Sequence, residues 1–204
     1  FATWFSFYRT RRESLIGAAT NALQETENLR VGWFRINGRT QPQMYDMKEE
    51  PEKMALLADI TRNMRASDST PNRSAAAHLG RQFQRTVSAS DPKPPVLLSC
   101  QKNAGMLFTD GYINETSNKV RMKDGIATYY DNSLVPSLES NSVPIPEECP
   151  DGKLDCKKTL HMNFYGVTLG TLGEQFGVTY LPKPDQPWIL TPNPYEVPPK
   201  FGTG

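Results

Sequence analysis

Residues 1–64 carry their hydrophobic side chains in two spacings, one typical of helices and one typical of strands. From Phe1 to about Glu25, apolar residues recur every three or four positions, which predicts a helix. Leu29–Ile36 alternates instead and predicts a strand. Asn37-Gly38 is a strong turn signal, and Gln41–Met47 would be the returning strand. We expect these strands to pair antiparallel at one edge of a sheet.

The next segment predicts two helices, Lys48–Met64 and Pro71–Val87, joined by a polar loop. Pro51 lies in the first turn of one helix and Pro71 opens the other, where proline is tolerated. The positions expected to be buried are Met54, Leu57, Ile60 and Met64 in the first helix and Ala75, Ala76, Leu79 and Phe83 in the second. His78, on the second helix, is interpreted as a satisfied or solvent-facing residue.

The second half of the chain begins with a short apolar strand, Ala104–Phe108, that stops at Thr109-Asp110-Gly111. Lys119–Tyr130 predicts a helix weakened by a glycine. Leu134–Lys158 is a polar insertion without periodicity. Leu160–Leu169 predicts the next strand, and His161 near its start is interpreted as structural.

The last part of the chain predicts little regular structure. Thr171–Phe176 is typical of a short helical turn. Seven prolines between Leu181 and Pro199 interrupt every pattern, so this segment is expected to be an extended linker or an arm. The predicted organisation is one domain over residues 1–180 and a proline-rich arm over residues 181–204.

The order of these elements predicts an α/β fold. Strands that alternate with helices favour a mostly parallel sheet with helices on both faces, here with an antiparallel hairpin at the edge. The leading helix of such a fold normally follows a central strand, which this sequence does not contain. Because the chain also begins with Phe instead of Met, we expect it to be a piece of a longer protein or a processed product.

Composition narrows the function classes. The 204 residues include 23 Lys and Arg against 22 Asp and Glu, and this net charge of +1 argues against a nucleic-acid-binding protein. No run approaches the roughly 18 apolar residues that a membrane span needs. The first residues have no basic segment ahead of an apolar stretch, so they do not form a signal peptide.

Three cysteines indicate an exported protein with a disulfide. Cys149 and Cys156 bracket a short polar loop, and Cys100 stands alone before the apolar strand. Their spacing lacks the CxxC pattern of a zinc site. A disulfide in an exported protein is the favoured interpretation, and three unpaired thiols in a cytosolic protein are the alternative.

Two side chains with oxygen atoms that could bind a ligand lie at positions where α/β proteins bind ligands. One follows a predicted strand, and the other precedes a predicted helix. Asp110 follows a strand, and ligands bind at the carboxyl ends of parallel strands. Thr70 lies in the loop that leads into a helix, where it could contribute to a cation site or act as the N-cap. The chain has no Gly-x-Ser-x-Gly elbow and no glycine-rich phosphate loop, so we expect a non-enzymatic protein.

Five segments resemble one family. They are FATWFSFYRTRRESL, STPNRSAAAHLGRQF, SCQKNAGMLFTDGY, GIATYYDNSLVP and LHMNFYGVTLG, which together span residues 1–170. Each is similar to a segment of the type IV pilus PilC/PilY proteins, and their spacing is compatible. The resemblance implies the Rossmann-like fold of the von Willebrand factor A domain.

The resemblance also implies a metal ion-dependent adhesion site. In the family, Mg²⁺, or Mn²⁺ or Ca²⁺ in its place, is bound by an Asp-x-Ser-x-Ser segment, a Thr and an Asp. Thr70 and Asp110 match the second and third elements, whereas the first is absent from this sequence. Tyr112 and Ile113 would flank the metal and contact a partner.

The implied function is that of a secreted protein at the pilus tip or outer surface. It would support pilus assembly and attachment, with minor pilins and host-cell or surface ligands as partners. The alternative is a purely structural assembly factor whose metal site has no role.

Within this fold, two disulfides are possible. A Cys100–Cys156 bond would join the starts of two neighbouring parallel strands, and a Cys149–Cys156 bond would close a small loop. The resemblance leaves both pairings open.

Overall fold

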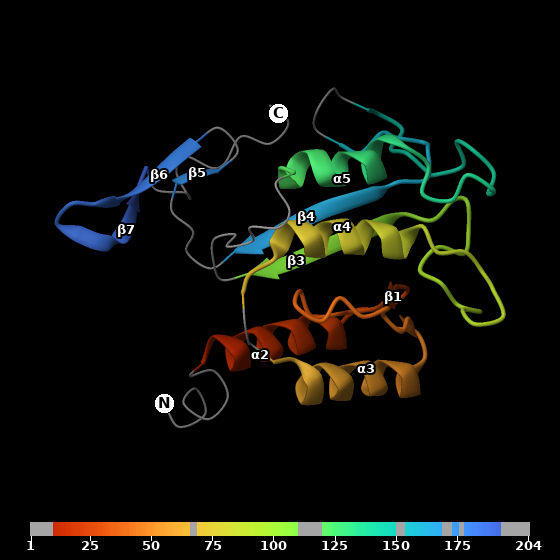
Figure 1. Ribbon diagram of the computed structural model, residues 1–204, viewed down its shortest axis with the longest axis horizontal. Helices are drawn as coiled ribbons and strands as arrows, with labels where there is room; N and C mark the ends of the chain where they lie inside the picture. Colours follow the sequence, from red (N-terminus) through yellow and green to blue (C-terminus); the bar gives the residue numbers. More distant parts are fainter. Residues whose placement is uncertain are drawn as a thin grey trace.

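The computed structural model describes residues 10–65, 69–109, 120–149, 154–168, 173–175 and 178–192 (Figure 1). Within these ranges the strands form three separate sheets, β1–β2, β3–β4 and β5–β6–β7. The first nine residues of the predicted leading helix and most of the predicted loop before Thr70 lie outside the described residues.

Two antiparallel helices form one layer of the molecule (Figure 1). The helix α2 (Arg11–Gln24) starts at a capping box, in which the Glu13 N–H donates to Thr10 Oγ1 and Glu13 Oε2 accepts from the Thr10 N–H. The helix α3 (Glu50–Asn63) lies along it. The Arg12 guanidinium of α2 donates to the carbonyl oxygens of Thr61 and Met64, so it satisfies acceptors that the end of α3 leaves open.

The buried face of α3 differs from the predicted one. Its buried residues are Lys53, Leu56 and Ile60, whereas Met54 is 56% exposed. Lys53 is buried because its ammonium group donates to the Gln24 carbonyl at the end of α2 (3.2 Å), while its aliphatic stem covers apolar surface. Of the predicted positions, Ile60 is confirmed as buried, whereas Lys53 and Leu56 are buried where Met54 and Leu57 were expected.

The first sheet is much shorter than predicted. The strands β1 (Arg30–Val31) and β2 (Tyr45–Asp46) pair antiparallel over two residues each, so the pairing direction is confirmed and the lengths are wrong. Beyond Val31 the two segments stay close, since a Cβ at Gly32 would lie 2.6 Å from Met44 Sδ, but the strand pairing does not continue. The Trp33 indole donates instead to Asp59 Oδ2 of α3 (2.7 Å).

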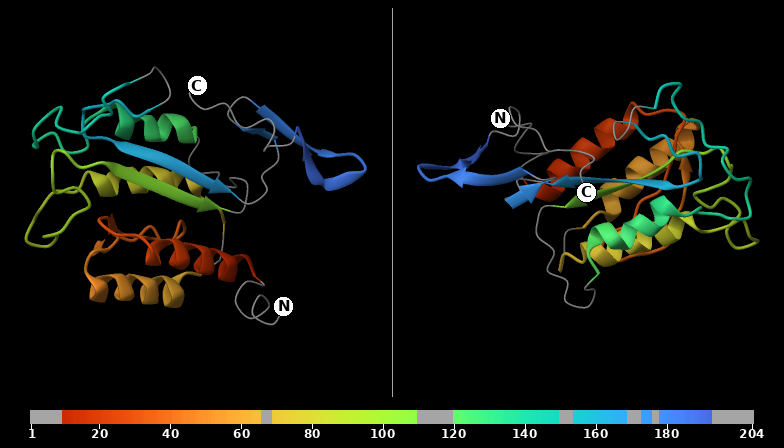
Figure 2. Two further views of the ribbon diagram at one scale, coloured as in Figure 1. Left: turned by 180° about the vertical axis from the view of Figure 1, so that it is seen from behind. Right: turned by 90° about the horizontal axis from the view of Figure 1, so that it is seen from above.

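The second sheet confirms the predicted parallel pair. The strands β3 (Asn103–Thr109) and β4 (Met162–Thr168) run parallel, with Asn103 opposite Met162 and Thr109 opposite Thr168. The helices α4 (Asn72–Phe83) and α5 (Met122–Asp131) cover one face of this sheet (Figure 2).

The core beneath these helices includes residues from the predicted polar insertion. It contains Val96, Tyr129, Leu134, Val135, Val143, Leu160 and Met162. The insertion has no helix or strand in its described residues, yet it is fastened by backbone hydrogen bonds from Leu134 to Leu160 (2.9 Å) and from Val143 to Lys158 (3.1 Å).

The other face of β3–β4 is open. Met106 and Tyr165 are opposite each other in the register and are 55% and 54% exposed, and Phe108 and Val167 form the next exposed pair. Although α2 and α3 lie toward this side in the right-hand view of Figure 2, they leave these side chains in solvent. The predicted helices on both faces, and a single sheet that joins β1–β2 to β3–β4, are therefore not found among the described residues.

The chain after residue 172 forms strands where we expected a helical turn and a linker. The strands β5 (Gly173–Gln175), β6 (Val178–Lys183) and β7 (Gln186–Thr191) form an antiparallel sheet. Proline is tolerated because the β6–β7 register shifts at Pro182/Lys183, and Pro184 lies in the turn between the strands. The part of the predicted arm after residue 192 lies outside the described residues.

The contact between α4 and α5 predicts opposite effects for two glycines. A Cβ at Gly80 would overlap the Tyr129 ring, so Gly80→Ala is expected to lower the free energy of unfolding by about 1–3 kcal/mol. A Cβ at Gly125, within α5, would meet only Val120 Cγ1 at 3.8 Å. Gly125→Ala should therefore stabilise the protein by about 0.5–1 kcal/mol, because glycine is a weak helix former. Urea unfolding of both variants measures the difference, and equal effects would contradict this packing.

Candidate functional site at the carboxyl end of β3

The loop that contains Thr70 meets the end of β3. The helix α4 begins at Asn72, whose side chain is buried with 2% exposure. Its amide Nδ2 donates to the hydroxyl of Thr109, the last residue of β3 (3.3 Å), and its backbone N–H donates to the Thr70 carbonyl (2.9 Å). One buried side chain therefore connects the Thr70 loop to the strand end, as the parallel α/β arrangement predicts.

Of the predicted metal-binding and partner-binding residues, one lies within the described residues and three lie outside them. Thr70 is half-buried and precedes Pro71, which is the N-cap residue of α4 and makes no side-chain capping hydrogen bond. Asp110 follows Thr109 directly in the sequence, but it lies outside the described residues. Tyr112 and Ile113 lie outside them as well. The metal and partner-binding roles of these four residues stay predictions.

The donor set at this place fits a hard cation in part. Asn72 Oδ1 is buried and has no hydrogen-bond partner among the described residues, and an amide oxygen is a suitable ligand for Mg²⁺ or Ca²⁺. The positive end of the α4 dipole disfavours a cation, so carboxylate charge must compensate for it. Within the described ranges, no three His, Cys, Asp or Glu side chains come together as a metal site.

Sequence reasoning missed Asn72, although the pattern contained a signal. Asn72, Ala75, Ala76 and Gly80 are the buried residues of α4, and they follow the spacing of one helix face. A polar residue on an otherwise apolar helical stripe needs a buried partner. Here that partner is Thr109.

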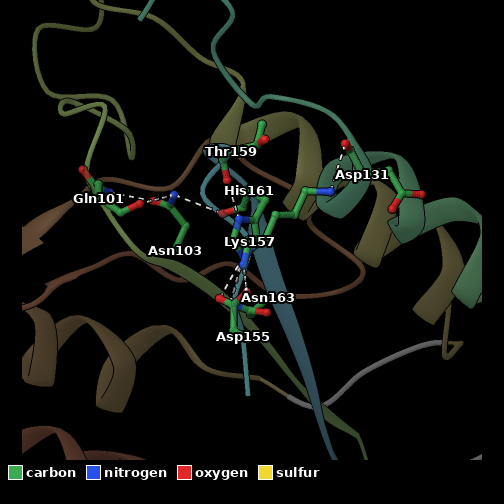
Figure 3. A network of polar contacts seen from close by, with 8 residues as sticks. All are labelled: Gln101, Asn103, Asp131, Asp155, Lys157, Thr159, His161 and Asn163. Atoms are coloured by element: carbon green, nitrogen blue, oxygen red, sulfur yellow. Dashed lines mark hydrogen bonds and ion pairs between the residues drawn. The ribbon is translucent and has the colours of Figure 1, made fainter. Parts of the chain in front are cut away.

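A second polar cluster lies at the opposite end of β3–β4 (Figure 3). His161 is 3% exposed, its Nδ1 faces the Thr159 carbonyl, and its Nε2 lies 2.9 Å from Asp155 Oδ2. Asn163 Nδ2 donates to the same carboxylate oxygen (2.8 Å). All three side chains have partners inside the protein, which agrees with the interpretation of His161 as structural.

Asn103 extends this cluster to the other strand. Its amide Nδ2 donates to the His161 carbonyl (3.2 Å), and its Oδ1 accepts from Gln101 Nε2 (2.7 Å). Gln101 also donates to the Pro95 carbonyl (2.8 Å). The starts of β3 and β4 are thus joined by buried side-chain hydrogen bonds in addition to the strand pairing.

Hydrogen bonding sets the charge state of Asp155. Burial by itself raises the pKa of this carboxyl, but hydrogen bonds from Asn163, His161 and the Lys157 N–H outweigh burial and lower the pKa below its ordinary value. The carboxylate therefore stabilises the cluster as an anion.

The disulfide lies beside this cluster. Cys149 and Cys156 are bonded, and Cys100 is free and exposed, so the Cys100–Cys156 alternative is wrong. Cys100 precedes β3 by three residues, whereas Cys156 precedes β4 by six. Closing a loop this short is worth about 2 kcal/mol through the entropy of the unfolded chain.

Comparison of the chain with models of known families, with curated proteins and with solved structures found no match. None of the described helices is long and apolar enough to cross a membrane.

The Asp155 cluster predicts a pH-dependent stability. Asp155→Asn is expected to lower the free energy of unfolding at pH 7 by about 1.5–3 kcal/mol, the usual value of hydrogen bonds to a charged group. Because the pKa is lowered in the folded state, this contribution is complete above the ordinary value of 3.8 and disappears as the pH falls further below it.

Denaturant unfolding between pH 7 and pH 3 measures this effect. The difference between wild type and Asp155→Asn should shrink toward the acid end of the range. Asp131→Asn, which changes an exposed carboxylate at the end of α5, is the control and should have little effect at any pH. A pH-independent difference for Asp155→Asn would show that the charge of Asp155 has no part in it.

Proposed function

We propose that the chain is an adhesion and assembly module of a type IV pilus tip-associated protein. It is exported, has no enzymatic activity, and binds a divalent cation at the carboxyl end of β3. The observation that supports this most is the Asn72–Thr109 hydrogen bond, because it holds the Thr70 loop against the residue that precedes Asp110. The sequence resemblance assigns the ligand roles to Thr70 and Asp110.

The residues of this chain would supply part of the coordination shell. Thr70 would contribute its hydroxyl, Asp110 its negative charge, directly or through water, and the amide oxygen of Asn72 is an available acceptor. An Asp-x-Ser-x-Ser segment upstream in the full-length protein would complete the protein ligands. Bound Mg²⁺ would supply a coordination position for a carboxylate of the adhesion partner.

The disulfide supports the proposed location. Disulfides persist in oxidising compartments such as the bacterial periplasm and the cell surface. The Cys149–Cys156 bond therefore fits a protein that passes through the periplasm on its way to the pilus.

The open face of β3–β4 favours a second candidate function. Monomeric proteins seldom expose adjacent large apolar side chains such as Met106, Phe108 and Tyr165 without a partner. In this alternative, the chain is a structural assembly factor that contacts minor pilins through this face, and the metal site has no role.

Calorimetric titration of Mg²⁺, Mn²⁺ and Ca²⁺ tests the metal proposal. The titration is made on this chain and on a form extended upstream to include the Asp-x-Ser-x-Ser segment. Binding should weaken at least about tenfold in Asp110→Ala and in Thr70→Ala, because each removes an oxygen ligand. Asp185→Ala, in the exposed β6–β7 turn, is the control and should bind normally. Binding by the extended form that is unaffected by Asp110→Ala would refute the metal site.

Piliation separates the two candidates. Under the alternative, Met106→Ser should reduce piliation, while Asp110→Ala leaves both piliation and adhesion intact. Met54→Ser is a matched control, since Met54 on α3 is 56% exposed and Met106 is 55% exposed. Normal piliation in Met106→Ser would count against a partner on the open face.

A further inference from the structure

A groove of about 460 Å³ lies between the segment that connects β1 to β2 and the second half of α3. Its lining includes Trp33 and Arg35 from the first segment, Tyr45 from β2, and Asp59, Asn63 and Arg65 from the helix side. None of these residues belongs to the candidate metal site or to the Asp155 cluster. The volume falls within the range of small-molecule sites.

Hydrogen bonds to Asp59 fix two other side chains of the lining. Asp59 Oδ2 accepts from the Trp33 indole N–H (2.7 Å), and Asp59 Oδ1 accepts from Asn63 Nδ2 (2.6 Å). Both oxygens of the carboxylate are thereby engaged, and the indole is held in one orientation. A preorganised side chain loses little conformational entropy when a ligand binds beside it.

Tyr45 adds a hydroxyl donor to the lining of the groove. The residue is 7% exposed and lines the groove. Burial and the negative charge of Asp59 raise the pKa of its phenol, so the hydroxyl keeps its proton at neutral pH. It can donate a hydrogen bond to a ligand oxygen.

The groove carries an excess of positive charge. Arg35 and Arg65 are exposed and line it, and Asp59 is the one carboxylate among its lining residues. Arg12, not Arg65, covers the last carbonyl groups of α3, so the guanidinium of Arg65 is not needed for capping. A guanidinium binds a carboxylate through two parallel hydrogen bonds.

The remaining polar groups of the lining suit hydroxyl groups. Gln41 and Gln43 present exposed side-chain amides, and Thr40 presents a hydroxyl. Amides both donate and accept hydrogen bonds, which matches the two roles of a sugar hydroxyl. Aromatic rings and amides together in one lining are suited to a ring with an apolar face and hydroxyl substituents.

We propose that this groove binds a saccharide that carries a carboxylate. The ring lies on the Trp33 and Tyr45 side, the hydroxyls meet the amides, and the carboxylate pairs with Arg35 and Arg65. A peptide is disfavoured because the connecting segment presents no strand edge for it to extend. The groove adjoins the C-terminal end of α3, whose dipole opposes any anion, so the charge of the two arginines has to outweigh it.

Titration with D-glucuronic acid and D-glucose, followed by NMR or calorimetry, tests this proposal. A chelator is present throughout, so a failure of the metal proposal does not affect the result. We expect saturable binding of glucuronic acid at pH 7, with glucose at least about tenfold weaker because it cannot pair with the arginines.

Matched variants locate the binding in the groove. Arg35→Gln and Arg65→Gln should each weaken glucuronic acid binding by about tenfold or more, whereas Tyr45→Phe should weaken it a few-fold. Arg62→Gln removes the same charge from an exposed position of α3 outside the lining and should have no effect. Thermal unfolding of each variant checks that its fold is retained.

Several outcomes would overturn the proposal. They are equal binding of the two sugars, no saturable binding of either, and an equal loss in Arg62→Gln and Arg65→Gln, which would indicate net charge alone. Tighter binding of a short Glu-rich peptide than of glucuronic acid would replace the saccharide with an acidic peptide as the ligand.

Discussion

The parallel pairing of β3 with β4 is the constraint on which the rest of the structure depends. A parallel pair needs a long crossover, and here α5 and the insertion after it supply one that packs back on the sheet. The buried hydrogen bonds of Asn103 and His161 fix the start of the pair, and α4 and α5 cover one of its faces. At the other end, Thr109 accepts a hydrogen bond from Asn72 of α4, and this contact holds the Thr70 loop beside the end of β3.

Sequence reasoning succeeded where one local pattern decided the outcome. β3, β4, α4 and α5 were predicted because their periodicity and their stop signals agreed. It failed where a contact between residues far apart in the sequence determined the structure. The Trp33 indole donates a hydrogen bond to Asp59, and the buried Lys53 ammonium group donates one to the Gln24 carbonyl. Neither contact can be predicted from the spacing of nearby residues. The β6–β7 hairpin was missed because prolines were taken only as breakers, although Pro184 is a turn signal.

Some residues of the candidate sites were predictable from the sequence and others were not, for the same reason. Thr70 and Asp110 were predicted from the positions they hold relative to predicted elements, and the structure brings the Thr70 loop to the residue before Asp110. Asn72 and the groove around Trp33 were not predicted, since both depend on which elements pack together. The disulfide pairing is open in the sequence because the insertion that carries Cys149 and Cys156 has no periodicity from which its path could be predicted.

The parallel register also decides how this part of the chain responds to tension. A pull on the two ends of the segment acts on the start of β3 and on the finish of β4, and these points lie at opposite ends of the pair. The load is then directed along the strands, so the hydrogen bonds between them share it together instead of opening one after another. A hairpin such as β6–β7, whose two ends lie side by side, opens from the end like a zip under the same pull.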